Sequence, residues 1–410
     1  MRNIGPTYHG WVIVAAAFAV TACLGEVLWS FGVFFKALEA EFGWSRGLTS
    51  TGYTFLAVGY GLSSITFGRL ADRYPPRHVL TATALISGTA IALCGRIESI
   101  IQLQGLLFAT GLGAGSLIPV PTSTVGRWFE SRPRGGIALG VTMAGVGVGA
   151  LLFAPLFNQL ILAFGWRTTF VVAGAIFFTI VSTASIAMKP SPVSYTLVHP
   201  DRSHVSSAGA PKPSTRSLLR APQFLQMVAI MVVTTFAFQV LTVHLVPYSV
   251  DVGISQTAAA AALGLAGGFS VPGRIGSGLL SDRFGWGTTL VLSQAGMALA
   301  ILVLPLVRHE SVLIAVVGLF GFCHGVRAVS VIGVLGRVFG MRPVGQLVGI
   351  MIAIAHIAGA SGPYLAGFLF DKVGSYTVTF LPLGALILVG AILSLRLDVD
   401  HPPATSSTPH

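Results

Sequence analysis

The sequence has few charged residues and very few cysteines. Lys, Arg, Asp and Glu make up 9% of the 410 residues, and hydrophobic residues make up 53%, whereas about 25% of a typical soluble domain is charged. This balance excludes disorder, a coiled coil and an ordinary soluble enzyme, and it indicates a chain surrounded by lipid. Cys23, Cys94 and Cys323 all lie in apolar runs, so we expect neither a disulfide framework nor a cysteine-based metal site.

Acidic residues are scarcer than basic ones. The 13 Asp and Glu residues stand against 24 Lys and Arg residues, which gives a net charge of +11. In a soluble protein this excess would suggest a nucleic-acid partner. Here the basic residues lie in short gaps between apolar runs, where they orient a chain in a bilayer. We therefore expect a lipid bilayer as the surroundings and no nucleic-acid partner.

Twelve apolar segments are long enough to cross a membrane, for which a helix needs about 20 residues. The sequence thus predicts an all-α membrane protein with twelve transmembrane helices. The segments are about 11–35, 48–70, 79–96, 100–124, 136–162, 168–188, 223–248, 257–280, 288–307, 312–335, 345–370 and 376–395.

The distribution of Lys and Arg predicts the orientation. With a cytoplasmic N-terminus, one side of the membrane collects sixteen of these residues and the other side six, so both termini are predicted to be cytoplasmic, in a bacterial inner membrane. The segment 189–222 is rich in Pro, Ser and His and predicts a flexible cytoplasmic linker. It separates an N-terminal six-helix bundle, 1–188, from a C-terminal bundle, 223–396, which a tail, 397–410, follows.

The two halves repeat the same short patterns in the same order. The segment 68–73, Gly-Arg-Leu-Ala-Asp-Arg, returns about 210 residues later as 278–283, Gly-Leu-Leu-Ser-Asp-Arg, and Gly-Arg-Trp-Phe at 126–129 returns as Gly-Arg-Val-Phe at 336–339. Parallel repeats of six helices imply two bundles with a binding site between them, near the middle of the membrane.

With these patterns the chain resembles the major facilitator superfamily. The Gly-x-Leu-Ala-Asp-Arg pattern, with Arg77 beyond it, is similar to the cytoplasmic loop signature of that superfamily. We expect Asp72 with Arg73, and Asp282 with Arg283, to form a gating motif that latches the two bundles in one state. The alternative is a charge cluster that only sets orientation.

A narrower resemblance points to the monocarboxylate porter family. It rests on His-Gly-Trp at 9–11, Phe-Gly-Val-Phe-Phe at 31–35, the segment 126–145 and Gly-Trp-Arg at 165–167. The oxalate:formate exchangers share much of this pattern. The resemblance implies a secondary transporter of small organic monocarboxylates, similar in size to lactate or pyruvate, which moves them with a proton by alternating access. It implies no enzymatic activity, no cofactor and no metal, and we expect a monomer.

Arg274 is the main candidate for binding a carboxylate. An arginine at the centre of a membrane costs about 2.5–3.5 kcal/mol, so it persists where it lines water or meets a partner. Ser270 and Pro272 precede it in a glycine-rich stretch, and its fork-shaped guanidinium suits a carboxylate. Monocarboxylate porters are similar in carrying a substrate-binding arginine in this helix. The alternatives are a structural pair with Glu26 or a place at a helix C-terminus.

Other polar residues in the predicted helices extend this site. His324 precedes Arg327 by three residues, so the two share a helix face. If Arg327 faces the cavity, a dicarboxylate or two carboxylates are favoured; otherwise it reaches the cytoplasmic surface. His356 and His244 titrate near neutral pH, and His356 is the better candidate because the eleventh helix usually lines the cavity in this superfamily. The alternative for both histidines is a hydrogen-bonded packing role.

Glu26 is the only carboxylate inside a predicted helix, and we expect it to carry the coupled proton. Burial favours its neutral form and a nearby arginine its charged form, so substrate on Arg274 would free Glu26 to accept a proton. Mammalian-type porters carry a lysine where Trp29 stands, so coupling through that lysine is excluded. Leu28 and Trp29 instead supply an apolar wall for a short alkyl group.

Two alternatives to the monocarboxylate symporter follow from these residues. One is an exchanger of small dicarboxylates, or of a dicarboxylate for a monocarboxylate, of the oxalate:formate type. The other, from a different functional class, is a carboxylate sensor that keeps a transporter fold and signals through a partner.

Overall fold

The computed structural model describes residues 6–130, 134–189, 218–339 and 341–395, and within these ranges it leaves out the side chains of 6–8, 68–69, 71–72 and 341–346. The described residues are almost entirely helical and contain no β-strand. The N-terminal half consists of α1 (Pro6–Trp29), α2 (Phe31–Phe42), α3 (Arg46–Arg73), α4 (Pro76–Cys94), α5 (Ile100–Ala114), α6 (Pro119–Trp128) and α7 (Gly135–Ala187). The C-terminal half consists of α9 (Pro222–Asp251), α10 (Gln256–Phe284), α11 (Trp286–Val303), the 3₁₀ turn η2 (Leu304–Leu306), α12 (Glu310–Phe339), α13 (Met341–Gly359), α14 (Ser361–Val373) and α15 (Thr377–Ser394).

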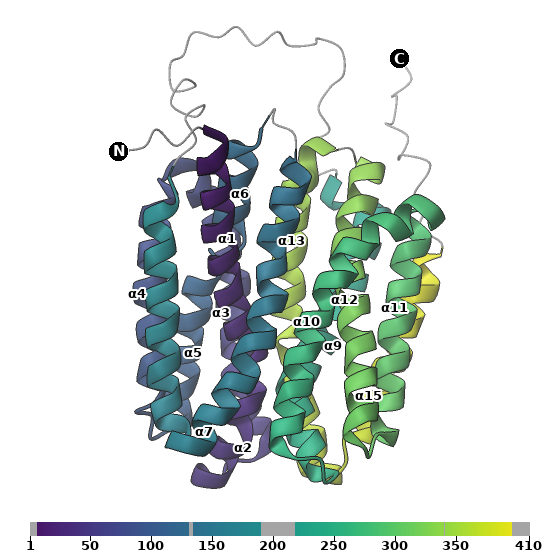
Figure 1. Ribbon diagram of the computed structural model, residues 1–410. Coiled ribbons are helices and arrows are strands. Elements are labelled where there is room, and N and C mark those ends of the chain that lie inside the picture. Colours follow the sequence, from purple (N-terminus) through teal and green to yellow (C-terminus); the bar gives the residue numbers. More distant parts are fainter. Residues whose placement is uncertain (1–5, 131–133, 190–217, 340, 396–410) are drawn as a thin grey trace, which may run out of the picture.

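These helices form twelve long rods that match the twelve predicted segments (Figure 1). Three rods consist of two helices each, namely α1 with α2, α5 with α6, and α13 with α14. Helix α7 supplies two rods, because the chain reverses at Gly165, whose φ of 79° favours glycine. Gly285 has the same conformation between α10 and α11. The reversal at Gly165 therefore separates the fifth and sixth predicted spans.

The starts of two corresponding helices use the same cap. The Ser45 side chain accepts a hydrogen bond from the backbone of Leu48 at the start of α3, and Ser255 accepts one from Ala258 at the start of α10. Such serine caps satisfy backbone N–H groups that the first helical turn leaves without partners. The repeat predicted from sequence patterns is therefore also a repeat of local structure.

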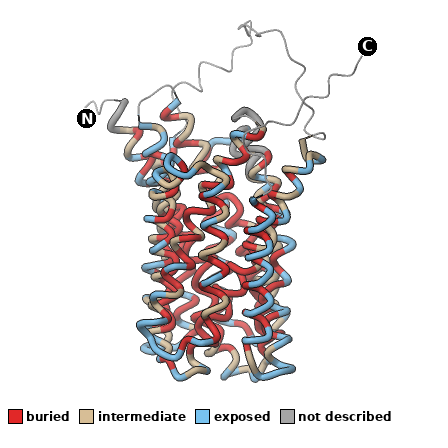
Figure 2. Tube along the Cα trace, turned by 90° about the vertical axis from the view of Figure 1, so that its right-hand side faces the viewer, coloured by how far each residue is buried: buried red, intermediate tan, exposed pale blue. Residues whose placement is uncertain are grey.

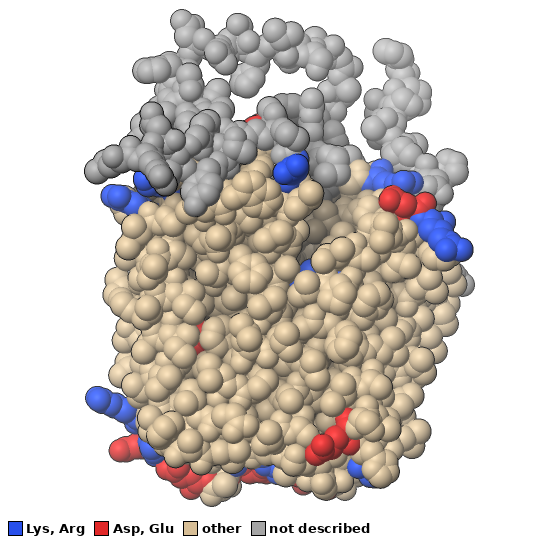
Figure 3. Space-filling view, viewed as in Figure 1, with Lys and Arg blue, Asp and Glu red and all other residues tan. Residues whose placement is uncertain are grey.

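The outside of the molecule suits a bilayer. Nine stretches of the described helices are long and apolar enough to cross a membrane, among them the 53-residue α7 with its two rods. Buried residues lie along the middle of the molecule, and exposed residues lie along its outside (Figure 2). Most charged residues lie at the two ends of the molecule, and the broad band between them shows only a few charged atoms (Figure 3). The protein is therefore a multi-pass membrane protein, as predicted.

The two halves lie side by side, and each resembles an upright bundle (Figure 1). They pack against each other mainly through α7 with α10, α3 with α13 and α14, and α2 with α9. Helix α7 ends at Ala187, and most of the predicted linker and the whole predicted tail lie outside the described residues. We call the end with α2 and Arg46 the lower end, as it is drawn in Figure 1.

Candidate functional site

Helices α7 and α10, which belong to opposite halves, pack closely near mid-height and separate toward the upper end. A Cβ atom on Gly147 of α7 would lie 2.6 Å from the Gly267 carbonyl oxygen of α10. Gly140 and Gly278 lie two and three helical turns further up on the same faces, because their spacings of 7 and 11 residues follow the helical period. Neither glycine has a neighbouring atom within 4 Å of such a Cβ. The interface between α7 and α10 is therefore open above its midpoint.

Arg274 lies at this interface, where the closely packed section ends. Its Nη1 donates a 2.6 Å hydrogen bond to the Met143 carbonyl oxygen of α7, in the opposite half. Its Nε has no hydrogen-bond partner, and the residue is half-buried. The expected alternative of a pair with Glu26 is absent among the described residues, because Glu26 has no partner at all. A neutral carbonyl leaves the guanidinium charge uncompensated.

Arg327 is a second buried cation beside Arg274. It is 4% exposed, its Nη1 donates to the Met231 sulfur atom of α9, and its Nε lacks a partner. The two guanidinium groups lie close enough for their charges to interact. Arg327 therefore points into the protein and does not reach the cytoplasmic surface, which was the alternative expectation.

His324 and His356 lie around the two arginines. Both interact electrostatically with Arg327, and His324 also interacts with Arg274. His356 of α13 lies across the interface from Tyr60 of α3, with ring centroids 4.8 Å apart. Within the described chain, neither arginine forms an ion pair with an acidic residue. We call Arg274, Arg327, His324 and His356 the cationic cluster.

Trp29 connects this cluster to the first rod. Its ring contacts Phe238 at 4.9 Å and His324 at 6.2 Å between centroids. Leu28 beside it is buried, and its carbonyl accepts a hydrogen bond from the Tyr53 hydroxyl. Ser270 is also buried, and its hydroxyl donates to the Gly267 carbonyl oxygen of its own helix. Of these three, Trp29 is in direct contact with the cationic cluster.

Glu26 lies in a different place from the one expected. It lines a small, mainly apolar cavity inside the N-terminal half, together with Ser30, Leu56, Ile91, Thr110 and Phe170. Both carboxyl oxygens are buried without a hydrogen-bond partner. Among the described residues, no arginine interacts with this carboxyl group. The expected direct exchange of partners between Arg274 and Glu26 is therefore wrong.

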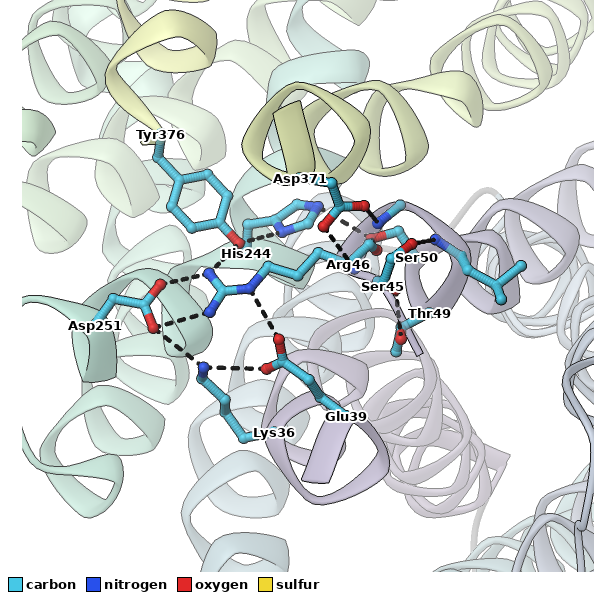
Figure 4. A network of polar contacts seen from close by, with 12 residues as sticks. Lys36, Glu39, Ser45, Arg46, Thr49, Ser50, His244, Asp251, Asp371 and Tyr376 are labelled. Atoms are coloured by element: carbon cyan, nitrogen blue, oxygen red, sulfur yellow. Dashed lines mark hydrogen bonds and ion pairs between the residues drawn. The ribbon is translucent and has the colours of Figure 1, made fainter. Parts of the chain in front are cut away.

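The lower end holds a dense network of polar contacts that joins the two halves (Figure 4). At its centre, both terminal nitrogens of Arg46 donate to the Asp251 carboxylate of α9, and its Nε donates to Glu39 at 3.1 Å. Lys36 bridges Glu39 and Asp251 at 3.0 and 3.1 Å. The guanidinium also stacks on Phe370 of α14, 3.8 Å from the ring centroid. We call this set of contacts the lower lock.

Further contacts from the C-terminal half tighten the lower lock. Asp371 of α14 accepts hydrogen bonds from the backbone N–H groups of Arg46 and Gly47, at 2.9 and 2.8 Å. His244 of α9 contacts Ser50 of α3 at 3.2 Å and the Tyr376 hydroxyl at 2.9 Å. His244 thus takes the hydrogen-bonded packing role that was its alternative. Arg46 is one of the six Lys and Arg residues that the sequence predicts on the side of the membrane opposite the termini.

The predicted gating motif lies at the opposite, upper end. Arg73, Asp282 and Arg283 are exposed, and the Asp72 side chain lies outside the described residues. Arg283 stacks on its neighbour Phe284, 5.4 Å from the ring centroid, and among the described side chains neither Asp282 nor Arg283 forms an ion pair with the other half. Among the described residues, the halves are therefore locked at the lower end and separated at the upper end of the interface between α7 and α10.

These features define a class of protein. Two parallel six-helix halves enclose a cationic cluster and are joined by a polar network at the lower end, which is the organisation of an alternating-access membrane transporter. The sequence model of the Major Facilitator Superfamily matches residues 16–309 and 277–410. The chain belongs to the major facilitator superfamily and is a transporter of that type.

Individual comparisons agree with this assignment. The chain is 27% identical to monocarboxylate transporter 13 of Rattus norvegicus over 400 residues, which cover 95% of this chain and 89% of the relative. It is also 27% identical to monocarboxylate transporter 11 of Mus musculus over 402 residues, covering 95% and 87%. The crystal structure of a point mutant of the nucleoside transporter NupG superimposes with a TM-score of 0.74 at 10% identity, covering 94% of this chain and 99% of NupG. That structural likeness concerns the fold.

Proposed function

We propose that this protein is a secondary transporter of small organic monocarboxylates of lactate or pyruvate size, which move with a proton. The observation that carries the proposal is the placement of Arg274 between the halves, where its guanidinium meets only a neutral carbonyl. Charge-assisted, bidentate hydrogen bonds make arginine a good partner for a carboxylate. The similarity to proteins named monocarboxylate transporters supports the same substrate class.

Arg274 also links substrate binding to the contact between the two halves. Its bond to Met143 crosses between α10 and α7, so an arriving carboxylate replaces a contact that holds the two halves together. The Trp29 ring beside the cluster and the Leu28 side chain supply apolar surface for a methyl or short alkyl group. Substrate binding and the packing of the halves therefore use the same guanidinium.

Uptake into liposomes tests this function. We expect the reconstituted protein to accumulate labelled lactate under an imposed pH gradient. Arg274→Ala should lower the uptake rate at low substrate by about 10- to 100-fold, because a charged hydrogen bond contributes about 1.5–3 kcal/mol. Lys372→Ala removes an exposed cation of the same half and should leave uptake unchanged. Wild-type rates for Arg274→Ala would refute the proposal, and lactate binding without flux would favour the sensor.

A second candidate function is supported by Arg327. Its buried guanidinium lies near the half-buried guanidinium of Arg274, and neither has an acidic partner among the described residues. A charge taken out of water is costly unless it is paired. A dicarboxylate, or two carboxylates bound together, balances both charges. Exchange of a dicarboxylate therefore predicts uptake that requires a counter-substrate inside the liposome and does not respond to a pH gradient. Arg327→Leu should then abolish oxalate uptake, whereas lactate symport would survive this change.

A further inference from the structure

The first rod contains one irregular residue. The part before it packs on the N-terminal half, and the part after it packs on the C-terminal half. Before the irregularity, Gly25 of α1 packs on the backbone of α7, where an added Cβ would lie 2.2 Å from the Val146 carbonyl oxygen. Beyond the irregularity, Gly32 of α2 packs on α9, where a Cβ would lie 2.4 Å from the Thr242 carbonyl oxygen. Helix α1 is therefore fixed within its own half, whereas α2 is docked on the opposite half.

Ser30 is the residue between these two contacts. The helical pattern is interrupted there, and the Val33 N–H donates to the Ser30 carbonyl with a three-residue spacing. A short stretch of 3₁₀ bonding inside a helix often marks a hinge. When the lower end opens, α2 has to leave α9 together with Arg46 and Lys36, while α1 stays with α7. Ser30 is the place in this rod where that bend is easiest.

Glu26 lies one helical turn before this hinge, and its carbonyl accepts the hydrogen bond of the Ser30 N–H at 3.2 Å. Its carboxyl group and the Ser30 hydroxyl both lack hydrogen-bond partners and both line the cavity of the N-terminal half. The cavity-lining residues of α3, α4, α5 and α7 carry no charge. The titratable group that interacts with Glu26 is the Cys23 thiol, on the same helix.

We propose that the lower end closes, by a bend at the hinge at Ser30, only when Glu26 is protonated. An ionised carboxylate without a partner is costly in an apolar cavity, so the arrangement with α2 docked on α9 accepts only the neutral acid. Loss of the proton instead favours bending at Ser30, undocking of α2 and release of the lower lock. The carboxyl group thereby regains water.

The same hinge links the proton to the substrate site. Trp29, beside Ser30, contacts His324 of the cationic cluster, whereas Glu26 faces the interior of its own half. The proposed proton site and anion site thus lie on neighbouring faces of one rod, and the bend at Ser30 changes both. This inference rests on the proposed proton coupling and names the residues that carry it out.

Distances between spin labels on α2 and α9 test the inference. Labels at Ala40→Cys and Val252→Cys, in a chain whose three buried native cysteines are replaced by alanine, report on docking of α2. Without substrate, we expect the ratio of separated to docked molecules to rise between pH 5.5 and pH 8, by up to about tenfold per pH unit for one coupled proton. Glu26→Gln should remain docked at both pH values, and Glu26→Asp should retain the response.

Several outcomes would overturn the inference. A wild-type pH response in Glu26→Gln would mean that another group titrates, and His244 would then be the first residue to replace. A change in the distances between the labels on adding sodium ions at constant pH would indicate that the cavity binds a metal ion. Because the experiment contains no carboxylate, its result does not depend on whether Arg274 binds lactate, so failure of the substrate proposal and failure of the hinge are distinguishable.

Discussion

Tyr376 stands in the C-terminal half where Arg167 stands in the N-terminal half, two residues after a glycine of positive φ in each case. In the N-terminal half, Arg167 pairs with Glu41 at 2.7 Å. Asp251 follows Glu41 by 210 residues but meets a tyrosine instead of an arginine, and it binds Arg46 of the opposite half. One substitution between the repeats thus explains why an ion pair within one half becomes a lock between both.

This comparison gives a matched pair of variants. Asp251→Asn should weaken the lower lock by about 1.5–3 kcal/mol, the contribution of charged hydrogen bonds, because it removes the carboxylate that Arg46 and Lys36 share. With Ser50→Cys as a buried reporter, labelling by a membrane-impermeant thiol reagent should become about 10- to 100-fold faster.

Glu41→Gln is the control, since it removes the corresponding carboxylate within the N-terminal half. It should leave the labelling rate near that of the parent chain. Equal acceleration by both variants would show that the lower end loosens through general loss of charge and that the Arg46–Asp251 contact has no special part.

At the scale of elements, the close approach of α7 and α10 depends on residues without side chains. A Cβ on Gly147 would meet the Gly267 carbonyl, Val271 and Ser270, all within 2.8 Å. Such contacts let the halves pack by backbone surface, which is how small residues stabilise helix pairs in membranes. Gly140 lies on the same face two turns away and meets nothing within 4 Å.

A valine at each position should therefore act differently. Gly147→Val should destabilise the protein by about 1–3 kcal/mol, the usual cost of overpacking, whereas Gly140→Val should leave stability unchanged. Thermal unfolding of the two purified variants in the same detergent measures this. Equal midpoints would mean that α7 and α10 do not hold the two halves together at Gly147.

At the scale of the whole molecule, the sequence predicted the rods and their pairing into repeats well. Lengths of apolar segments and repeated loop patterns are local signals, and a membrane leaves few other arrangements for them. Arg274 was found for a similar reason, since a charge in the middle of an apolar segment is costly and persists where it has a use.

Contacts that depend on helix rotation were not predictable in this way. A change of one residue turns a side chain by about 100°, and a segment length does not fix that angle. Glu26 was therefore expected at the substrate site, although it faces its own half. In the sequence, Arg46 does not differ from other basic residues in loops. Its contacts come from α9, α14 and the start of α15, which are distant in the sequence, and no local pattern predicts such contacts.

The lower lock has a consequence for the empty carrier. The lower end of the molecule is held by ion pairs and aromatic rings, whereas the exposed Asp282 and Arg283 at the upper end form no ion pair with the opposite half among the described side chains. A transporter whose two ends are held together unequally populates one of its two conformations more than the other. We therefore expect the protein without substrate to rest with the space between its halves open toward the upper end, so that a substrate arriving from that side binds more readily than one from the other side.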